Sequence, residues 1–244
     1  MTDAVLYDFT DGLARITLNR PDSRNALNIA MCEELVAAAR RAREDGARCV
    51  MVRGEGAVFC AGADLKERQG MGDDAVRARR LKAFAAYDAL ERLPMPTIAV
   101  VEGPAVGSGL EIAAACDFII ATPAASFRTP EALWGTVGAT QRLPRIIGKR
   151  LAKDLMFTGR ALGAEEAREA GLVARVVPPE ALATCLAEIS ATILKAPPAA
   201  MALAKRCVDE GLERDPRGAL ATEILAIEES LAAAEWRKKM QGFG

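Results

Sequence analysis

The chain has 244 residues, of which 51% are apolar, so it can bury a large core in one domain or in one domain with an appended helical piece. Its 32 basic and 33 acidic residues give a net charge of −1. This balance lacks the positive field that nonspecific binding to nucleic acid or to an anionic membrane requires. We therefore expect neither nucleic acid nor membrane as a partner.

The absence of histidine removes several classes of chemistry. Ser-His-Asp and Cys-His nucleophile pairs and imidazole-ligated metals are excluded, and we expect no metal site. A site that transfers protons must use Asp, Glu, Lys, Cys or Tyr, and a carboxylate is the usual choice after histidine.

Six cysteines are scattered along the chain with no CxxC pair, and several lie in apolar runs, which favours reduced core thiols. The first residues are acidic where a signal peptide would be basic, and charges interrupt every apolar segment. We expect a soluble, cytoplasmic protein.

The amino-terminal elements begin with a hairpin. Residues 5–10 and 13–18 alternate about Asp11-Gly12, which predicts two antiparallel strands. Apolar residues at helical spacing predict a helix over residues 26–44, and residues 48–52 are typical of a buried strand.

The middle of the chain repeats the alternation of helix and strand. Helical spacing covers residues 73–93 and ends at Pro94 and Pro96, before an apolar strand at residues 97–101. A short helix after Gly109 leads to a third apolar strand at residues 117–121. Strands that are apolar throughout and alternate with helices predict an α/β fold with a largely parallel sheet covered on both faces.

Helices dominate after Thr140. Residues 172–177 still favour a strand, and three helices are predicted at residues 179–195, 199–213 and 216–236. We expect an α/β core over residues 1–190 and a helical carboxy-terminal region over residues 191–244.

Glu111 is the only charged residue between Gly103 and Cys116, in a segment otherwise made of turns and small apolar residues. Because burial disfavours the charged form, a carboxyl group there is expected to have a raised pKa and to exchange protons near neutral pH.

Two segments share the order strand, glycine turn, helix start. Residues 50–52 lead into 60–64, and residues 99–101 lead into 107–111. Ligands gather outside the carboxyl ends of such strands, where two converging N–H groups would bind an oxyanion. Taken alone, each glycine turn is more often a structural turn than part of a ligand-binding site. Gly107-x-Gly109 lacks the residues and spacing of phosphate and dinucleotide loops, so those types of nucleotide binding are discarded.

Six motifs occur along the chain in a characteristic order and at characteristic spacing. They are Asn-Arg-Pro-Asp-Ser-Arg-Asn-Ala-Leu at 19–27, Phe-Cys-Ala-Gly-Ala-Asp-Leu-Lys at 59–66, Gly-Ser-Gly-Leu-Glu-Ile-Ala-Ala-Ala-Cys-Asp at 107–117, Pro-Glu at 130–131, Thr-Gln-Arg-Leu at 140–143 and Ala-x-x-Ala-Gly-Leu-Val at 167–173. Over nearly its whole length the chain resembles the crotonase family of enoyl-CoA hydratases and isomerases. The resemblance implies an α/β fold of the ClpP/crotonase kind, a spiral of repeated ββα units with a helical carboxy-terminal region.

The resemblance also implies roles for individual residues. Glu111 and Glu131 match the two family carboxylates, and the backbone N–H groups of Ala63 and Ser108 match those that hold the thioester oxygen. The implied reaction is syn addition of water to a 2-trans-enoyl-CoA, giving a 3-hydroxyacyl-CoA. We assign Glu111 as the base on water and Glu131 as the proton donor to the α-carbon. No cofactor is required, because the coenzyme A thioester is the substrate.

Coenzyme A contacts are implied at Arg24, Ala61, Asp64, Leu65 and Lys66. For Lys66 a solvated helix face is an equal alternative, and Asp64 also fits a structural role in bonding to nearby backbone.

Other residues are interpreted as structural. Arg77, Arg79 and Arg80 are expected on a solvated helix face, and Asp117 is expected to bond to nearby backbone. Trp134, Cys60 and Cys116 are expected to pack in the interior.

Two features depart from the family pattern. The loop at residues 135–140 is about three residues shorter than the family's glycine-rich form, which helps to seat the attacking water. The chain also ends at Gly244, where the family often continues into a basic tail. Either affinity for coenzyme A is lower, or Arg237, Lys238 and Lys239 substitute for that tail.

Two alternatives to a hydratase stay open. One is double-bond isomerisation or another crotonase reaction that uses Glu131 alone. The other is a non-catalytic acyl-CoA-binding protein, although a binder gains nothing from two costly buried carboxylates. By resemblance we expect a homotrimer or a dimer of trimers with its interface on the carboxy-terminal helices, and a place in fatty acid metabolism.

Overall fold

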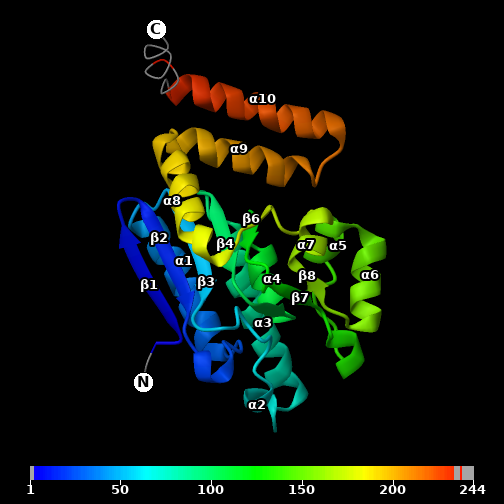
Figure 1. Cartoon of the computed structure of the whole chain (residues 1–244). Coiled ribbons are helices and arrows are strands. Elements are labelled where there is room, and N and C mark those ends of the chain that lie inside the picture. The colour runs from blue at the N-terminus through cyan, green and yellow to red at the C-terminus, as the bar shows by residue number, and fades with distance from the viewer. Residues whose placement is uncertain (1–2, 234–236, 238–244) are drawn as a thin grey trace.

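A six-stranded sheet organises the chain in the computed structural model, which describes residues 3–233 and residue 237 (Figure 1). The strand order is β1-β2-β3-β4-β6-β9. Only β1 and β2 pair antiparallel, and every later pair is parallel. The strands are β1 (Val5–Thr10), β2 (Leu13–Leu18), β3 (Cys49–Gly54), β4 (Thr97–Val101), β6 (Phe118–Ala121) and β9 (Arg175–Val176).

The hairpin forms as the sequence predicts. Asp11 and Gly12 both have positive φ, at 52° and 84°, as a two-residue turn with the twist of a hairpin requires. All five residues of β4 are buried, and β3 exposes only Arg53. The predicted parallel sheet, covered on both faces, is therefore confirmed.

Helices α1 (Ile29–Glu44) and α3 (Asp73–Glu91) pack against each other, while α8 (Pro179–Lys195) covers the opposite face of the sheet through Leu182 (Figure 1). Helix α1 begins three residues later than predicted. The reason is that Asn28 caps it by accepting a hydrogen bond from Met31 N at 2.9 Å, while Leu27 pairs as a strand with Ala63.

A second sheet of three short strands was not predicted. It has the order β5-β7-β8, with β5 (Pro104–Val106), β7 (Ser126–Arg128) and β8 (Leu162–Gly163). Strands of two or three residues are too short to show a period of two in the sequence.

The predicted strand at residues 172–177 is also too long. Its first residues, Leu172 and Val173, donate to the carbonyl of Ala167 and so close the end of helix α7 (Ala164–Glu169) instead of joining the sheet. Only β9 remains as strand.

Shorter helices surround the two sheets. They are η1 (Pro21–Ser23), α2 (Leu65–Arg68), α4 (Ser108–Ala114), η2 (Glu131–Trp134), α5 (Arg142–Ile147), α6 (Lys149–Thr158) and α7 (Ala164–Glu169). The last two helices, α9 (Pro198–Gly211) and α10 (Pro216–Ala233), pack side by side beyond the core (Figure 1). Residues 234–236 of the predicted last helix lie outside the described residues. Within the described part of the chain, no helix is long and apolar enough to cross a membrane.

The start of α4 lies against the turn that follows β3. Cys60 pairs with β5 through two hydrogen bonds, from its N–H to Pro104 O at 3.2 Å and from Val106 N–H to its own carbonyl oxygen at 2.9 Å. A Cβ on Gly109 would overlap that carbonyl oxygen and lie 2.8 Å from the Cβ of Cys60. Only glycine allows this approach.

We predict that Gly109→Ala lowers the free energy of unfolding by about 1–3 kcal/mol or more, because a methyl group has no room against backbone atoms. The matched control is Gly163→Ala, where an added Cβ meets nothing within 4 Å. Urea unfolding of both variants measures the difference, and an equal loss in both would contradict the close contact.

Candidate active site

Glu111 lies in the first turn of α4 and is only 8% exposed. Its backbone N–H bonds to Gly107 O at 3.0 Å, and its helix neighbours Leu110 and Ile112 are buried. Burial raises the pKa of the Glu111 carboxyl, and the nearby Arg142 guanidinium offsets only part of that rise. The raised pKa expected from the sequence is therefore confirmed.

Glu131 begins η2, directly after Pro130. Burial raises the pKa of Glu131, and the negative charge of Glu111 raises it further. Its Oε2 atom is buried and has no hydrogen-bond partner within the described residues. The charge of Glu111 thus acts on Glu131, which is consistent with both carboxyl groups belonging to one site.

Gly107 lies between the two glutamates. It has a φ of 52°, and a Cβ added there would lie 2.6 Å from Glu131 Oε1. Its N–H donates to Arg128 O at 2.8 Å, which fixes the turn before α4 to the strand that leads into Glu131. The backbone therefore joins the two segments that carry the glutamates.

Ala63 and Ser108 occupy neighbouring turns. A Cβ on Gly62 would lie 4.0 Å from Ser108 N and 3.0 Å from Val106 O, so the residue before Ala63 lies against the start of α4. Ser108 is the first residue of α4 and has no carbonyl one turn earlier in the helix to accept its N–H. Among the described residues, the Ala63 N–H donates to no backbone carbonyl. Both N–H groups are thus available to a carbonyl oxygen.

The residues predicted to contact coenzyme A lie around the Ala63 turn. The carbonyl of Arg24, whose side chain is exposed, accepts from Ala61 N at 3.0 Å. Leu65 and Lys66 are exposed at the start of α2.

Asp64 differs from these neighbours because its carboxylate is used by the fold. It caps α2 by accepting from Lys66 N at 3.0 Å and Glu67 N at 3.2 Å, and it pairs with Arg20 at 2.9 Å. This geometry favours the structural role for Asp64.

Two arginines predicted on a solvated face are covered to different degrees, since Arg79 is buried and Arg80 is half-buried. Arg79 is 5% exposed, because it binds Glu67 at 2.8 Å and the Leu27 carbonyl. Arg80 donates to Thr136 Oγ1 at 3.0 Å, and its charge lowers the pKa of both site glutamates against the larger effect of burial. The interpretation was wrong for Arg79 and holds only in part for Arg80, because helix α3 packs against α4 along this side.

The short loop at residues 135–140 lies directly on Glu131. A Cβ on Gly138 would lie 2.8 Å from Glu131 Oε1, and Thr136 N–H donates to Glu131 O at 3.0 Å. The predicted packing of Trp134 next to this loop is wrong, since that side chain is 72% exposed.

Arg142 is a site residue that sequence analysis missed. It begins α5, and its Nη1 lies 3.1 Å from Glu111 Oε2. The only sequence signal was its place in the Thr-Gln-Arg-Leu motif, because nothing in the spacing links residue 142 to residue 111.

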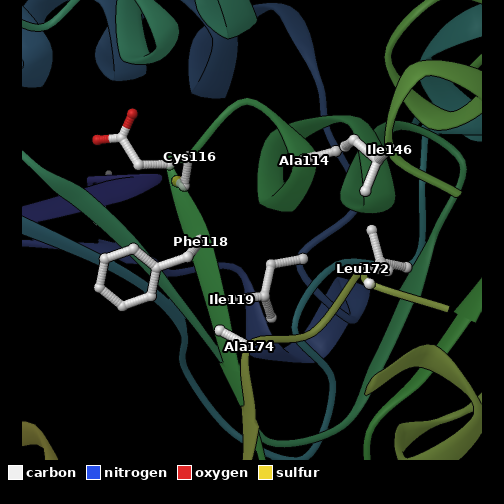
Figure 2. A pocket seen from close by; sticks show the side chains of 9 residues that line it. Ala114, Cys116, Phe118, Ile119, Ile146, Leu172 and Ala174 are labelled. Atoms are coloured by element: carbon white, nitrogen blue, oxygen red, sulfur yellow. The ribbon is translucent and has the colours of Figure 1, made fainter. Parts of the chain in front are cut away.

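A separate hollow of about 120 Å³ lies at the other end of α4. Figure 2 shows Ile119, Ile146 and Leu172 around it, with Ala114 on the helix. Asp117 on its wall bonds to Thr97 N at 2.7 Å and pairs with Lys205 at 2.9 Å, which confirms the structural role predicted for it. The wall is otherwise mainly apolar, and neither Glu111 nor Glu131 lines it.

Residues 8–244 match the family model for enoyl-CoA hydratase/isomerase. The mouse (Mus musculus) enoyl-CoA hydratase domain-containing protein 2, mitochondrial, is 38% identical over 95% of this chain and 81% of its own length. The enoyl-CoA isomerase/hydratase fer4 of Mycosarcoma maydis is 34% identical over 95% of this chain and 89% of its own.

The crystal structure of enoyl-CoA hydratase from Bacillus anthracis superposes with a TM-score of 0.94 at 37% identity, covering 98% of this chain and 95% of that one. The match extends over both sheets and the carboxy-terminal helices, so the predicted crotonase fold is confirmed. The chain belongs to the enoyl-CoA hydratase/isomerase family.

Proposed function

We propose that the protein is an enoyl-CoA hydratase that adds water syn across the double bond of a 2-trans-enoyl-CoA to give a 3-hydroxyacyl-CoA. The observation that carries the proposal is the unequal surroundings of the two glutamates. Glu111 has a guanidinium partner at 3.1 Å, whereas Glu131 Oε2 has no partner among the described residues. A cation favours the ionised form, so Glu111 is suited to be the base and Glu131 the acid.

The division of labour follows from this asymmetry. Glu111 takes a proton from water as the water oxygen bonds to the β-carbon, and the π electrons of the double bond move onto the thioester oxygen. The N–H groups of Ala63 and Ser108 stabilise the negative charge on that oxygen. In well-studied oxyanion holes, one such donor lowers the free energy of the transition state by about 3 kcal/mol. Glu131 then gives its proton to the α-carbon as the carbonyl re-forms. Proton exchange between the glutamates and water restores the starting state.

A second candidate, double-bond isomerisation, is favoured by the loop at residues 135–140. The loop is short and packs on Glu131, and Glu111 is already paired with Arg142. In that reaction an ionised Glu131 would take a proton from the α-carbon of a 3-enoyl-CoA and return it to the γ-carbon, with no water added.

Binding of coenzyme A is proposed at Arg24, Ala61, Leu65 and Lys66, which surround the Ala63 turn. Lys238 and Lys239, proposed as substitutes for a basic tail, lie outside the described residues. A role limited to binding acyl-CoA is disfavoured, because two buried carboxyl groups with raised pKa values carry a cost that binding alone does not repay.

Assembly into trimers or paired trimers is proposed through the carboxy-terminal helices. Several of their large apolar side chains are exposed in the single chain, and such patches mark interaction surfaces. They are Val208, Leu212, Leu220, Ile224, Leu225, Ile227 and Leu231.

With crotonyl-CoA as substrate, we expect loss of the conjugated thioester absorbance in the wild type. Glu111→Gln and Glu131→Gln should each lower kcat by about 10²- to 10⁴-fold, because each removes one proton-transfer group. Binding of a saturated acyl-CoA, measured by calorimetry, should change little. No turnover of crotonyl-CoA, together with conversion of a 3-enoyl-CoA, would establish the isomerase instead.

The free energy of unfolding should also report the burial of Glu131. Its pKa is raised in the fold, so the wild type loses stability as pH rises from the unfolded value of about 4.3 through the folded one. Glu131→Gln does not titrate, so its stability relative to wild type should be greater at pH 8 than at pH 4.

Urea unfolding at both pH values measures this difference. The control is Glu188→Gln, at an exposed position on α8, which removes one carboxylate outside the candidate site. A stability difference for Glu131→Gln that does not change with pH would contradict the raised pKa.

A further inference from the structure

Arg142 contacts two carboxylates at once. Its Nη1 donates to Glu111 Oε2 at 3.1 Å, and its Nε donates to Glu91 Oε1 at 3.0 Å. Its Nη2 also binds the second oxygen of Glu91. Glu91 is the last residue of α3, so one guanidinium joins α3, α4 and α5.

The bond to Glu91 is bidentate, which fixes both the position and the plane of the guanidinium. The arginine side chain is 21% exposed and also lies over the Tyr87 ring, 5.8 Å from its centre. Tyr87 in turn forms a hydrogen bond with Ser108. The guanidinium is thus held from two sides, and its remaining edge faces Glu111.

Exposure decreases along this chain of charges. The Glu91 side chain is 45% exposed, that of Arg142 is 21% exposed and that of Glu111 is 10% exposed. Glu91 therefore reaches solvent, while the carboxylate at the other end lies in the interior, where an ionic partner has its largest effect.

We propose that Arg142 is a positioning residue that is oriented by Glu91 and that holds Glu111 as the ionised carboxylate of the site. This inference rests on the hydratase proposed above. Arg142 acts through Glu111 and has no assigned contact with substrate. Glu91 both orients the cation and shares its charge.

Other charged or titratable groups also face Glu111 and must be considered. From α3 these are Arg80, Tyr87 and Glu91, and from η2 Glu131 adds a negative charge. The strands packed near α4, which are β4, β5 and β6, contain no ionisable residue. Arg142 is the cation with the largest effect on Glu111, and it is also the one that is hydrogen-bonded to it.

The two members of the pair have opposite effects on the pKa of Glu111. Arg142 lowers it, whereas the charge of Glu91 raises it. Removal of the cation should therefore move the acid limb of the activity profile to higher pH, and removal of the Glu91 charge should move it to lower pH. If Arg142 and Glu91 had a purely structural role, their substitution would not shift the acid limb in opposite directions.

The pH dependence of kcat/KM for crotonyl-CoA tests the proposal in Arg142→Gln, Arg142→Lys and Glu91→Gln. We expect the acid limb to move up by about 1 pH unit or more in Arg142→Gln and to move down in Glu91→Gln. Arg142→Lys keeps the charge but cannot make the fork to Glu91, so its limb should lie between wild type and Arg142→Gln. Arg145→Gln, an exposed position on the same helix, is the control and should keep the wild-type profile.

A second readout separates this inference from the proposed reaction. In protein labelled with ¹³C at the glutamate carboxyl carbons, the Glu111 signal is assigned by its loss in Glu111→Gln, and its titration is followed without substrate. An upward shift in Arg142→Gln supports the inference even if crotonyl-CoA is not hydrated. An unchanged Glu111 titration overturns it, whatever the activity.

If Arg142→Gln does not fold, Glu91→Gln and Arg142→Lys decide the question by the same titration. A lower Glu111 midpoint in Glu91→Gln and a higher one in Arg142→Lys support the pair. The opposite shift or no shift in Glu91→Gln overturns the role given to Glu91.

Discussion

The pairing of Cys60 with β5 is the contact on which the site depends. Strands β3 and β4 are parallel neighbours, so the turns that follow them leave the sheet at the same edge. The hydrogen bonds between Cys60 and β5 join these two turns, and Gly109 lets the start of α4 close upon them. Two N–H groups from distant parts of the sequence thereby converge, with Glu111 one turn further along the helix. Loss of this contact would separate the two N–H groups that we propose as donors to the thioester oxygen.

Burial of charge is the second constraint. Glu111 and Glu131 are acidic groups in surroundings that disfavour their ionised forms, and each raises the cost of ionising the other. The protein balances this with arginines from neighbouring helices, Arg142 directly and Arg80 from α3. A site with two such carboxyl groups stores unfavourable free energy that a core of apolar residues would not contain, and this cost is typical of functional sites.

The elements that depend on local sequence patterns could be predicted from the sequence. The hairpin, the buried strands at residues 49–54 and 97–101 and the helix containing Glu111 follow from turn residues and apolar periodicity. The small sheet was missed because its strands are two or three residues long, and the ion pairs of Arg79 and Arg142 were missed because their partners lie on other elements. Charge on a helix surface does not show which neighbour will cover it. The assignment of Glu131 relied on the resemblance to a family, since an acidic residue after proline is ordinary by itself.

The small sheet has a consequence for how this enzyme family can diversify. Gly107 and Arg128 are joined by a ladder hydrogen bond, Glu111 follows four residues after the first, and Glu131 follows three residues after the second. The main-chain positions from which the two glutamates project are therefore joined by main-chain hydrogen bonding. Side chains that do not contact the glutamates can be exchanged without moving these two positions. A family built on this frame can thus vary the surroundings of its two carboxylates while it keeps the main chain that carries them.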